Sequence, residues 1–261
     1  MQRHLVSVLA ALLVGAAVPA RAQTAPDDAT RSMEYLRAQE SADCMALALR
    51  QPEDALGSAE AWEQRGGGAA ARHCQAVALF GLGKYPEAAT LFEEVGETVS
   101  NESPPLAAEA LAQAGMAWQS ADMYDRALAA QTAALKLAPD DVDIWVDRST
   151  TQFFLGNCWE AIDDLNEAHE RAPENPGILI LRASAYRCVE SIELARADID
   201  RALELAPDDP EALLERGTLR HATGDVEGAR ADWLKVAEDA AGTPTADAAQ
   251  RNLERLDLDA Q

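Results

Sequence analysis

Apolar, small and polar residues recur along this chain with a period of about 34 residues. One position of the pattern holds a large apolar residue: Leu111, Trp145, Leu179 and Leu213. A second holds a small residue, in Ala127, Ala161, Ala195 and Ala229, and a third holds Pro139, Pro173 and Pro207. Because an internal period of this length is typical of stacked repeats, the pattern predicts an array of similar units rather than one globular domain.

The pattern inside each unit indicates two helices joined by a short turn. No strand-like alternation of apolar and polar residues is sustained, so we expect an all-α fold. The predicted turns lie at Asp122, Gly156-Asn157, Glu190-Ser191 and Gly224-Asp225. Between units, Asp141, Asn175 and Asp209 are suited to cap the next helix, because their side chains accept hydrogen bonds from its first N–H groups.

The chain divides into six expected segments. Residues 1–22 form a cleaved signal peptide, and residues 23–29 form a disordered start. Residues 30–100 hold degenerate helix pairs, 101–107 hold a proline-rich insertion around Pro104-Pro105, and 108–242 hold four regular units. A polar capping helix and tail at 243–261 cover the open end of the array.

The N-terminus has the three parts of a secretion signal. Arg3 provides the positive start, Leu5 to Val18 an uncharged apolar core, and Ala20-Arg21-Ala22 a small-x-small cleavage site. Cleavage makes Gln23 the first residue of a protein that is periplasmic or secreted. An uncleaved anchor is the alternative, although the apolar run is short for a bilayer span.

The charge of the chain is strongly acidic, at −23 at pH 7. A leader that contains Arg3 and Arg21 but no acidic residue takes two positive charges with it, which leaves −25. A protein with this charge repels phosphate backbones and anionic membrane surfaces. We therefore expect no nucleic-acid binding and no stable membrane insertion.

Four cysteines in an exported chain favour disulfide bonds. Cys44 and Cys74 have the same separation along the chain as Cys158 and Cys188, and this separation places each pair in neighbouring layers of stacked helix pairs. Helices pack about 8–10 Å apart and a disulfide allows Cα separations of at most roughly 7 Å, so pairings across more than two layers do not fit. The expected bonds are Cys44–Cys74 and Cys158–Cys188, and four buried reduced cysteines are the alternative. We expect no metal site, because no CxxC or HxxxH spacing occurs.

Residues of opposite charge also follow the period. Arg148, Arg182 and Arg216 are each followed, at one constant separation, by an aspartate, in Asp164, Asp198 and Asp232. This separation places the arginine on one helix of a unit and the aspartate on the facing side of its partner. In the unit that begins at 108, Ala114 and Ala130 take these positions, so the two charges are present together or absent together. We interpret them as structural ion pairs, since a catalytic pair is not needed three times.

The unit with Trp145, Gly156, Ala161, Ala168 and Pro173 resembles the tetratricopeptide repeat family, whose 34-residue units are helix hairpins. The resemblance is specific over 108–240 and weaker towards the N-terminus. Gln131 and Ala241 depart from the family pattern and suggest looser packing at those points. The resemblance implies an α-solenoid that forms a right-handed superhelical arc and binds proteins or peptides.

The resemblance also implies that the first helix of every unit lines the concave face. The partner-binding residues of the regular units are then Glu109, Gln113, Met116, Asp143, Val146, Asp147, Thr150, Phe153, Ile180, Leu181, Arg187, Glu211, Leu214 and Glu215. They are joined by His73, Val77, Phe80, Gln119, Ser184, Thr218 and His221. Because acidic and apolar side chains predominate, this surface favours a partner segment with basic and apolar residues, and a carboxylate clamp is not expected.

The leading hypothesis is an exported, non-catalytic scaffold for a protein or peptide segment, in which basic residues of the partner meet Glu109, Asp147 and Glu215. The alternative is a self-assembling structural module of the cell envelope, and the sequence leaves the oligomeric state open. We expect no enzyme and no cofactor. His73, His169 and His221 stand in different units, and no arrangement of residues resembles a catalytic site.

Overall fold

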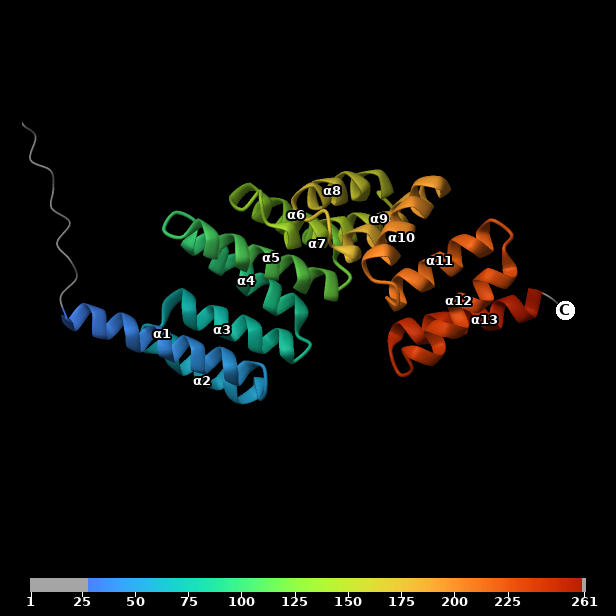
Figure 1. Cartoon of the computed structure of the whole chain (residues 1–261). Coiled ribbons are helices and arrows are strands. Elements are labelled where there is room, and N and C mark those ends of the chain that lie inside the picture. The colour runs from blue at the N-terminus through green and yellow to red at the C-terminus, as the bar shows by residue number, and fades with distance from the viewer. Residues whose placement is uncertain (1–27, 260–261) are drawn as a thin grey trace, which may run out of the picture. The chain divides into compact units, whose positions relative to one another are not determined.

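The computed structural model describes residues 28–259, with side chains from 37 to 258 (Figure 1). The predicted signal peptide at 1–22 and residues 23–27 of the predicted disordered start lie outside the described residues. The described part contains thirteen α-helices and no strand, which confirms the all-α prediction. The helices are α1 (Asp28–Ala48), α2 (Pro52–Gln64), α3 (Gly68–Gly81), α4 (Tyr85–Val99), α5 (Pro104–Ser120), α6 (Tyr124–Leu137), α7 (Val142–Phe154), α8 (Cys158–Arg171), α9 (Pro176–Cys188), α10 (Ile192–Leu205), α11 (Pro210–Ala222), α12 (Val226–Asp239) and α13 (Pro244–Asp259).

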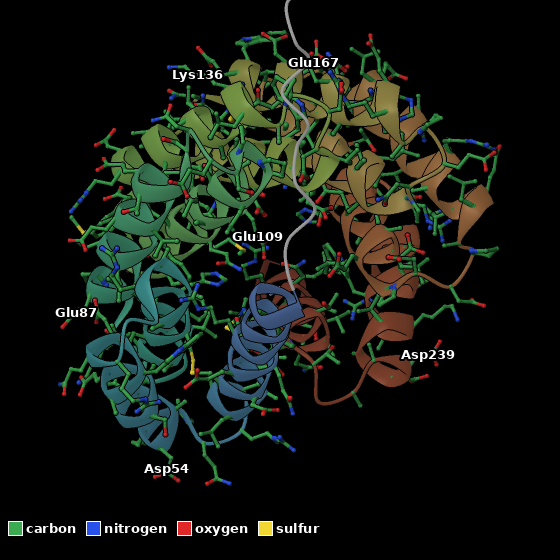
Figure 2. All side chains as sticks on the ribbon, turned by 90° about the vertical axis from the view of Figure 1, so that its left-hand side faces the viewer. Asp54, Glu87, Glu109, Lys136, Glu167 and Asp239 are labelled. Atoms are coloured by element: carbon green, nitrogen blue, oxygen red, sulfur yellow. A yellow bond between two sulfur atoms is a disulfide. The ribbon has the colours of Figure 1, made fainter. Side chains whose placement is uncertain are left out.

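Consecutive helices pack as hairpins within the described residues 40–259, which belong to one compact unit. The hairpins are α3 with α4, α5 with α6, α7 with α8, α9 with α10, and α11 with α12. First helices of neighbouring hairpins also contact one another, α5 with α7, α7 with α9, and α9 with α11. Figure 2 shows Glu109 of a first helix on the inner side of these helices, and Glu87, Lys136 and Glu167 of second helices on the outer side. This arrangement is the predicted solenoid of helix hairpins.

One residue in the left-handed backbone region closes the turn inside each regular hairpin. These residues are Asp122 (φ 57°), Gly156 (φ 80°), Glu190 (φ 58°) and Gly224 (φ 88°). A residue with positive φ ends a helix by turning the chain back on itself. Because only glycine adopts this conformation without a steric penalty, Gly156 and Gly224 fit the turn better than Asp122 and Glu190.

Side-chain caps start the first helix of the later hairpins. Asp141 Oδ1 accepts the backbone N–H groups of Asp143 (3.0 Å) and Ile144 (3.3 Å) at the start of α7. Asp209 accepts two N–H groups at the start of α11, and Asn175 accepts one at the start of α9. Each cap satisfies N–H groups that have no acceptor inside the helix, so the boundaries between units are fixed by local chemistry.

The proline-rich stretch at 101–107, predicted as an inserted loop, is partly helical. Helix α5 begins at Pro104, so Pro104 and Pro105 occupy its first turn. Proline is tolerated there because the first N–H groups of a helix lack an intrahelical acceptor. A loop is therefore wrong for residues 104–107, which lengthen α5 where it packs against α4.

The small positions of the repeat lie where two helices cross. All four predicted alanines, Ala127, Ala161, Ala195 and Ala229, are fully buried. Gly115 and Gly217 permit a closer approach still, because a Cβ atom would lie 2.5 Å from Gln131 Cγ and 2.5 Å from Trp233 Nε1, respectively. The expectation of looser packing at Gln131 is wrong. The Gln131 side chain is fully buried, and its Oε1 atom accepts a hydrogen bond from Thr151.

Three bidentate ion pairs join the two helices of single hairpins. Arg148 Nε and Nη2 donate to the Asp164 carboxylate at 2.9 and 2.6 Å. The distances are 2.7 and 2.7 Å for Arg182 and Asp198, and 3.0 and 2.7 Å for Arg216 and Asp232. All three aspartates are buried, so these bonds replace the water that the carboxylates lose.

The arginines also reach the preceding hairpin. The Nη1 atom of Arg148 lies 3.3 Å from Thr132 Oγ1 on α6, and that of Arg182 lies 3.0 Å from Asn166 Oδ1 on α8. Each of these guanidinium groups therefore binds the second helix of its own hairpin and of the one before. Two of the three pairs thus stabilise the seam between units as well as the hairpin.

Two disulfide bonds also connect neighbouring layers. Cys44 of α1 is bonded to Cys74 of α3, and Cys158 at the start of α8 to Cys188 at the end of α9. The Cα separations are 6.1 and 6.2 Å, and no described cysteine is free. This is the pairing that the equal spacing of the cysteines favours. Disulfides are typical of oxidising compartments.

The last helix covers the end of the array. Ala249, Leu253 and Leu256 of α13 pack with Trp233 and Val236 of α12 in one buried cluster. Within residues 28–259, every helix is too short or too polar to span a bilayer.

Removing one partner of a buried ion pair should destabilise the protein strongly. Asp198→Ala leaves the Arg182 guanidinium half-buried without its carboxylate, and we expect the free energy of unfolding to fall by about 3 kcal/mol. Arg201→Ala breaks the exposed Arg201–Glu204 pair on the same helix and should cost about 0.5 kcal/mol or less. Urea unfolding followed by circular dichroism measures both values. Equal losses for the two variants would contradict a structural role for the buried pair.

Candidate functional site

Three hollows follow one another along the surface formed by α3, α5, α7, α9 and α11, which we term the first-helix face. The hollow between α3 and α5 measures about 140 Å³ and is lined by Val77, Phe80, Phe92, Gln113 and Met116. The hollow between α5 and α7 measures about 670 Å³, and the one between α7 and α9 about 280 Å³. Together they make this face the candidate binding surface.

The hollow between α5 and α7 is acidic with apolar walls. Glu109, Gln113 and Met116 recur at helical spacing on α5 and therefore lie on one side of it. Asp143, Val146 and Asp147 do the same on α7, and the capping residue Asp141 lies at the rim. Four carboxylates thus surround one hollow, with methyl and thioether groups between them. Such a lining suits a positively charged side chain with an apolar stem.

Asp147 is the most perturbed of these acids. The pKa of its carboxyl group is raised to about 6, mainly by burial and further by the negative charges of Asp143 and Asp141. Burial and like charges thus disfavour the ionised form of Asp147, and no described lysine, arginine or histidine forms an ion pair with it. A cation bound beside it would stabilise the charged form and lower its pKa.

The hollow between α7 and α9 is mainly apolar. Phe153 and Leu181, each 37% exposed, line it together with Thr150, Ser184 and Arg187. The Thr150 hydroxyl donates to the carbonyl of Val146 on its own helix, so it presents little polarity to the hollow. A partner's apolar side chain would be removed from water here.

Two predicted partner-binding residues do not face solvent. Ile180 is only 6% exposed, because it packs among Leu179, Ala183 and other core residues of α9 to α11. Glu215 is 8% exposed and accepts a hydrogen bond from Arg187 Nε at 2.6 Å. The expectation that Glu215 meets a partner's basic residue is therefore wrong, since Arg187 already neutralises it.

Other predicted residues of the face lie at its edges or bond within the chain. Glu211 is exposed in the first turn of α11, and Leu214 is partly buried against the neighbouring core. Gln119 Nε2 donates to the carbonyl of Asp147 at 2.9 Å, which links α5 to α7. The rings of His221 and Trp233 lie 5.7 Å apart. His73 shares a hydrogen bond with Gln113, and Thr218 donates to the Leu214 carbonyl.

Several lining residues were not predicted from the sequence: Pro105, Ala108, Ala112, Ile144 and Phe154. Pro105 was missed because 101–107 was interpreted as an inserted loop. A proline pair directly after Ser103 is also the pattern of a helix start, which was the available signal. Across the described residues, no group of three or more His, Cys, Asp or Glu side chains is arranged to hold a metal ion.

Comparison with known proteins gives matches to one family and one fold. Residues 180–244 match a family model described as tetratricopeptide repeat. MamA residues 41 to the end from Desulfovibrio magneticus RS-1 is 21% identical, with a TM-score of 0.58 over 67% of this chain and 97% of that one. TTC0263, a thermophilic TPR protein of Thermus thermophilus, is 22% identical, with a TM-score of 0.57 over 72% and 98%. No curated protein matches the chain. At these identities the likeness to the solved structures extends to the fold alone.

The raised pKa of Asp147 predicts a pH-dependent effect of Asp147→Asn. A folded-state pKa of about 6, above the unfolded value of about 3.9, means that the carboxyl stabilises the fold at low pH and loses this contribution as pH rises through 6. Asn carries no such charge, so the variant should unfold at equal or lower urea concentration at pH 4 but gain about 1 kcal/mol relative to wild type at pH 8. The exposed Asp163→Asn variant controls for the loss of one negative charge. A difference between wild type and Asp147→Asn that stays constant from pH 4 to pH 8 would contradict the raised pKa.

Proposed function

We propose that the chain, whose residues 180–244 match a tetratricopeptide repeat model, is an exported, non-catalytic scaffold that binds an extended segment of a protein partner on its first-helix face. The segment carries a basic residue for the hollow between α5 and α7 and an apolar residue for the hollow between α7 and α9. The leader-like N-terminus and the two disulfides support export.

The observation that carries this proposal is the order of the two larger hollows. An acidic hollow, with Asp147 partly removed from water, directly precedes an apolar one that exposes Phe153 and Leu181. Neighbouring first helices lie about 10 Å apart, which is the length of about three residues of extended chain. The two hollows therefore suit a basic and an apolar side chain about three residues apart.

Electrostatics favour such a partner for two reasons. The chain carries a net charge of −23, which attracts a basic segment from a distance and raises its association rate. Close to the surface, a lysine or arginine beside Asp147 also relieves the repulsion from Asp143 and Asp141. The neutral pair Arg187–Glu215 takes no part in this attraction.

Selection of random displayed peptides on the purified protein tests the proposal. We expect enriched sequences to contain lysine or arginine about three residues from an aromatic or large aliphatic residue. The selected peptide should bind Asp147→Asn/Glu109→Gln about tenfold or more weakly than wild type, because two charge-assisted contacts are lost. Phe153→Ala should weaken binding by a similar factor through loss of apolar contact.

A matched control changes the same net charge elsewhere. Glu170→Gln/Glu238→Gln removes two exposed carboxylates from the second helices α8 and α12, and its affinity should equal that of wild type at moderate salt. Enriched peptides without basic residues, or equal losses in the control and in the Asp147/Glu109 variant, would refute binding at the acidic hollow.

A second candidate, self-assembly, is favoured by exposed aromatic side chains on α7 and α8. Phe154 at the end of α7 and Trp159 at the start of α8 are 60% and 61% exposed, and Tyr124 stacks on Phe154 with ring centroids 5.1 Å apart. Aromatic side chains of this size are enriched in interfaces. If these residues join copies of the chain, the sedimentation coefficient should rise with concentration for wild type and stay constant for Trp159→Ala. A wild-type monomer at every concentration would exclude this function.

A further inference from the structure

A cavity of about 450 Å³ lies between α10 and α11 and contains three arginines. Arg196 comes from α10, and Arg216 and Arg220 come from α11. Ile192, Ile199 and Leu219 form apolar parts of the wall. In a chain with a net charge of −23, such a concentration of guanidinium groups in one cavity is a local exception.

The seam between α8 and α9 shows which residues occupy the equivalent positions one period earlier. One period earlier, the positions of Arg196, Arg220 and Thr223 are held by Ile162, Tyr186 and Val189. Ile162 belongs to a buried cluster of α8 and α9, and Tyr186 and Val189 pack against that cluster. At the seam between α10 and α11, two arginines and a threonine therefore replace three residues that fill the earlier seam with apolar groups. This replacement accounts for the chemical character of the cavity.

Two of the three guanidinium groups are paired with carboxylates of the chain. Asp232 accepts hydrogen bonds from both Arg216 and Arg220, each at 2.7 Å. Arg220 also lies 3.6 Å from Asp225, and Asp200 lines the cavity and offsets part of its positive charge.

Two guanidinium groups have donors to spare. Among the described residues, none forms an ion pair with Arg196. Arg216 keeps the ion pair with its own aspartate. In the two earlier units, Thr132 and Asn166 lie beside the Nη1 atom of the arginine, whereas Asp200 occupies the equivalent position next to Arg216. No hydrogen bond joins Arg216 to Asp200 in the described part of the chain. The pKa of Arg216 is raised mainly by its hydrogen bond to Asp232 and further by the charges of Asp232 and Asp200.

We propose that this cavity binds a small organic anion, whose carboxylate or phosphate group lies between Arg196 and Arg216, the two guanidinium groups with unused donors. The planar fork of arginine binds both kinds of oxyanion through paired N–H groups. The apolar part of the ligand contacts Ile192, Ile199 and Leu219, and the volume lies within the range of about 300–1,000 Å³ for small-molecule sites. The site uses the side of α11 that faces α10, so it is separate from the first-helix face and independent of the function proposed there.

Isothermal titration calorimetry at low ionic strength tests the site, with glycerol 3-phosphate and hexanoate as probes. We expect saturable binding of at least one probe, which also identifies the preferred oxyanion. Arg196→Gln should lower its affinity about tenfold or more, through loss of a charge-assisted contact. Arg201→Gln removes the same charge from an exposed position on α10 and should leave the affinity unchanged.

A second variant separates loss of the site from loss of the fold. Arg196→Ile/Thr223→Val restores two of the residues found one period earlier, so it should keep the melting temperature of wild type or raise it while abolishing binding. The proposal is overturned if neither probe binds wild type, if Arg196→Gln and Arg201→Gln bind equally, or if the folded Arg196→Ile/Thr223→Val variant binds as well as wild type.

Discussion

The seam between neighbouring hairpins is the contact on which this fold depends, because no hairpin buries its apolar side alone. The buried clusters show this directly. Leu179 and Ile199 of one hairpin share a cluster with Ala212 and Leu219 of the next, and Ile162 of α8 shares one with Ile178 of α9. Each unit is therefore stabilised by the unit beside it, and stability depends on how well every seam is packed.

The hollows at the seams differ from one another in chemical character. The repeat fixes the small residues at the crossings and the arginine–aspartate pairs, but it leaves the residues around them free to vary. The hollow between α5 and α7 collects carboxylates, the hollow between α7 and α9 exposes Phe153 and Leu181, and the cavity between α10 and α11 holds three arginines. One backbone pattern thus offers three different environments in succession.

The sequence predicted those features that follow the period of the repeat. Helices, turns and the Asp141 cap depend on local residues that recur at this step, and the period itself brings Arg182 opposite Asp198. Features that do not recur with the period could not be predicted in this way. Arg187 and Glu215 lie on the first helices of successive units. At the equivalent positions two periods earlier stand Gln119 and Asp147, which are also in contact but carry no pair of opposite charges, so no recurring charge pattern marked the pairing of Arg187 with Glu215. The burial of Ile180 depends on how neighbouring helices are placed. The helix start at Pro104 could not be predicted because a proline pair fits both a loop and the first turn of a helix.

The positions of the disulfides have a mechanical consequence. Cys158–Cys188 ties the hairpin of α7 and α8 to that of α9 and α10, and Cys44–Cys74 ties the end of α1 to α3. Neither covalent tie reaches the seam between α10 and α11. Under tension along the array, the layers joined by a disulfide would stay together, and separation would begin at a seam that only noncovalent contacts hold, such as the one between α10 and α11.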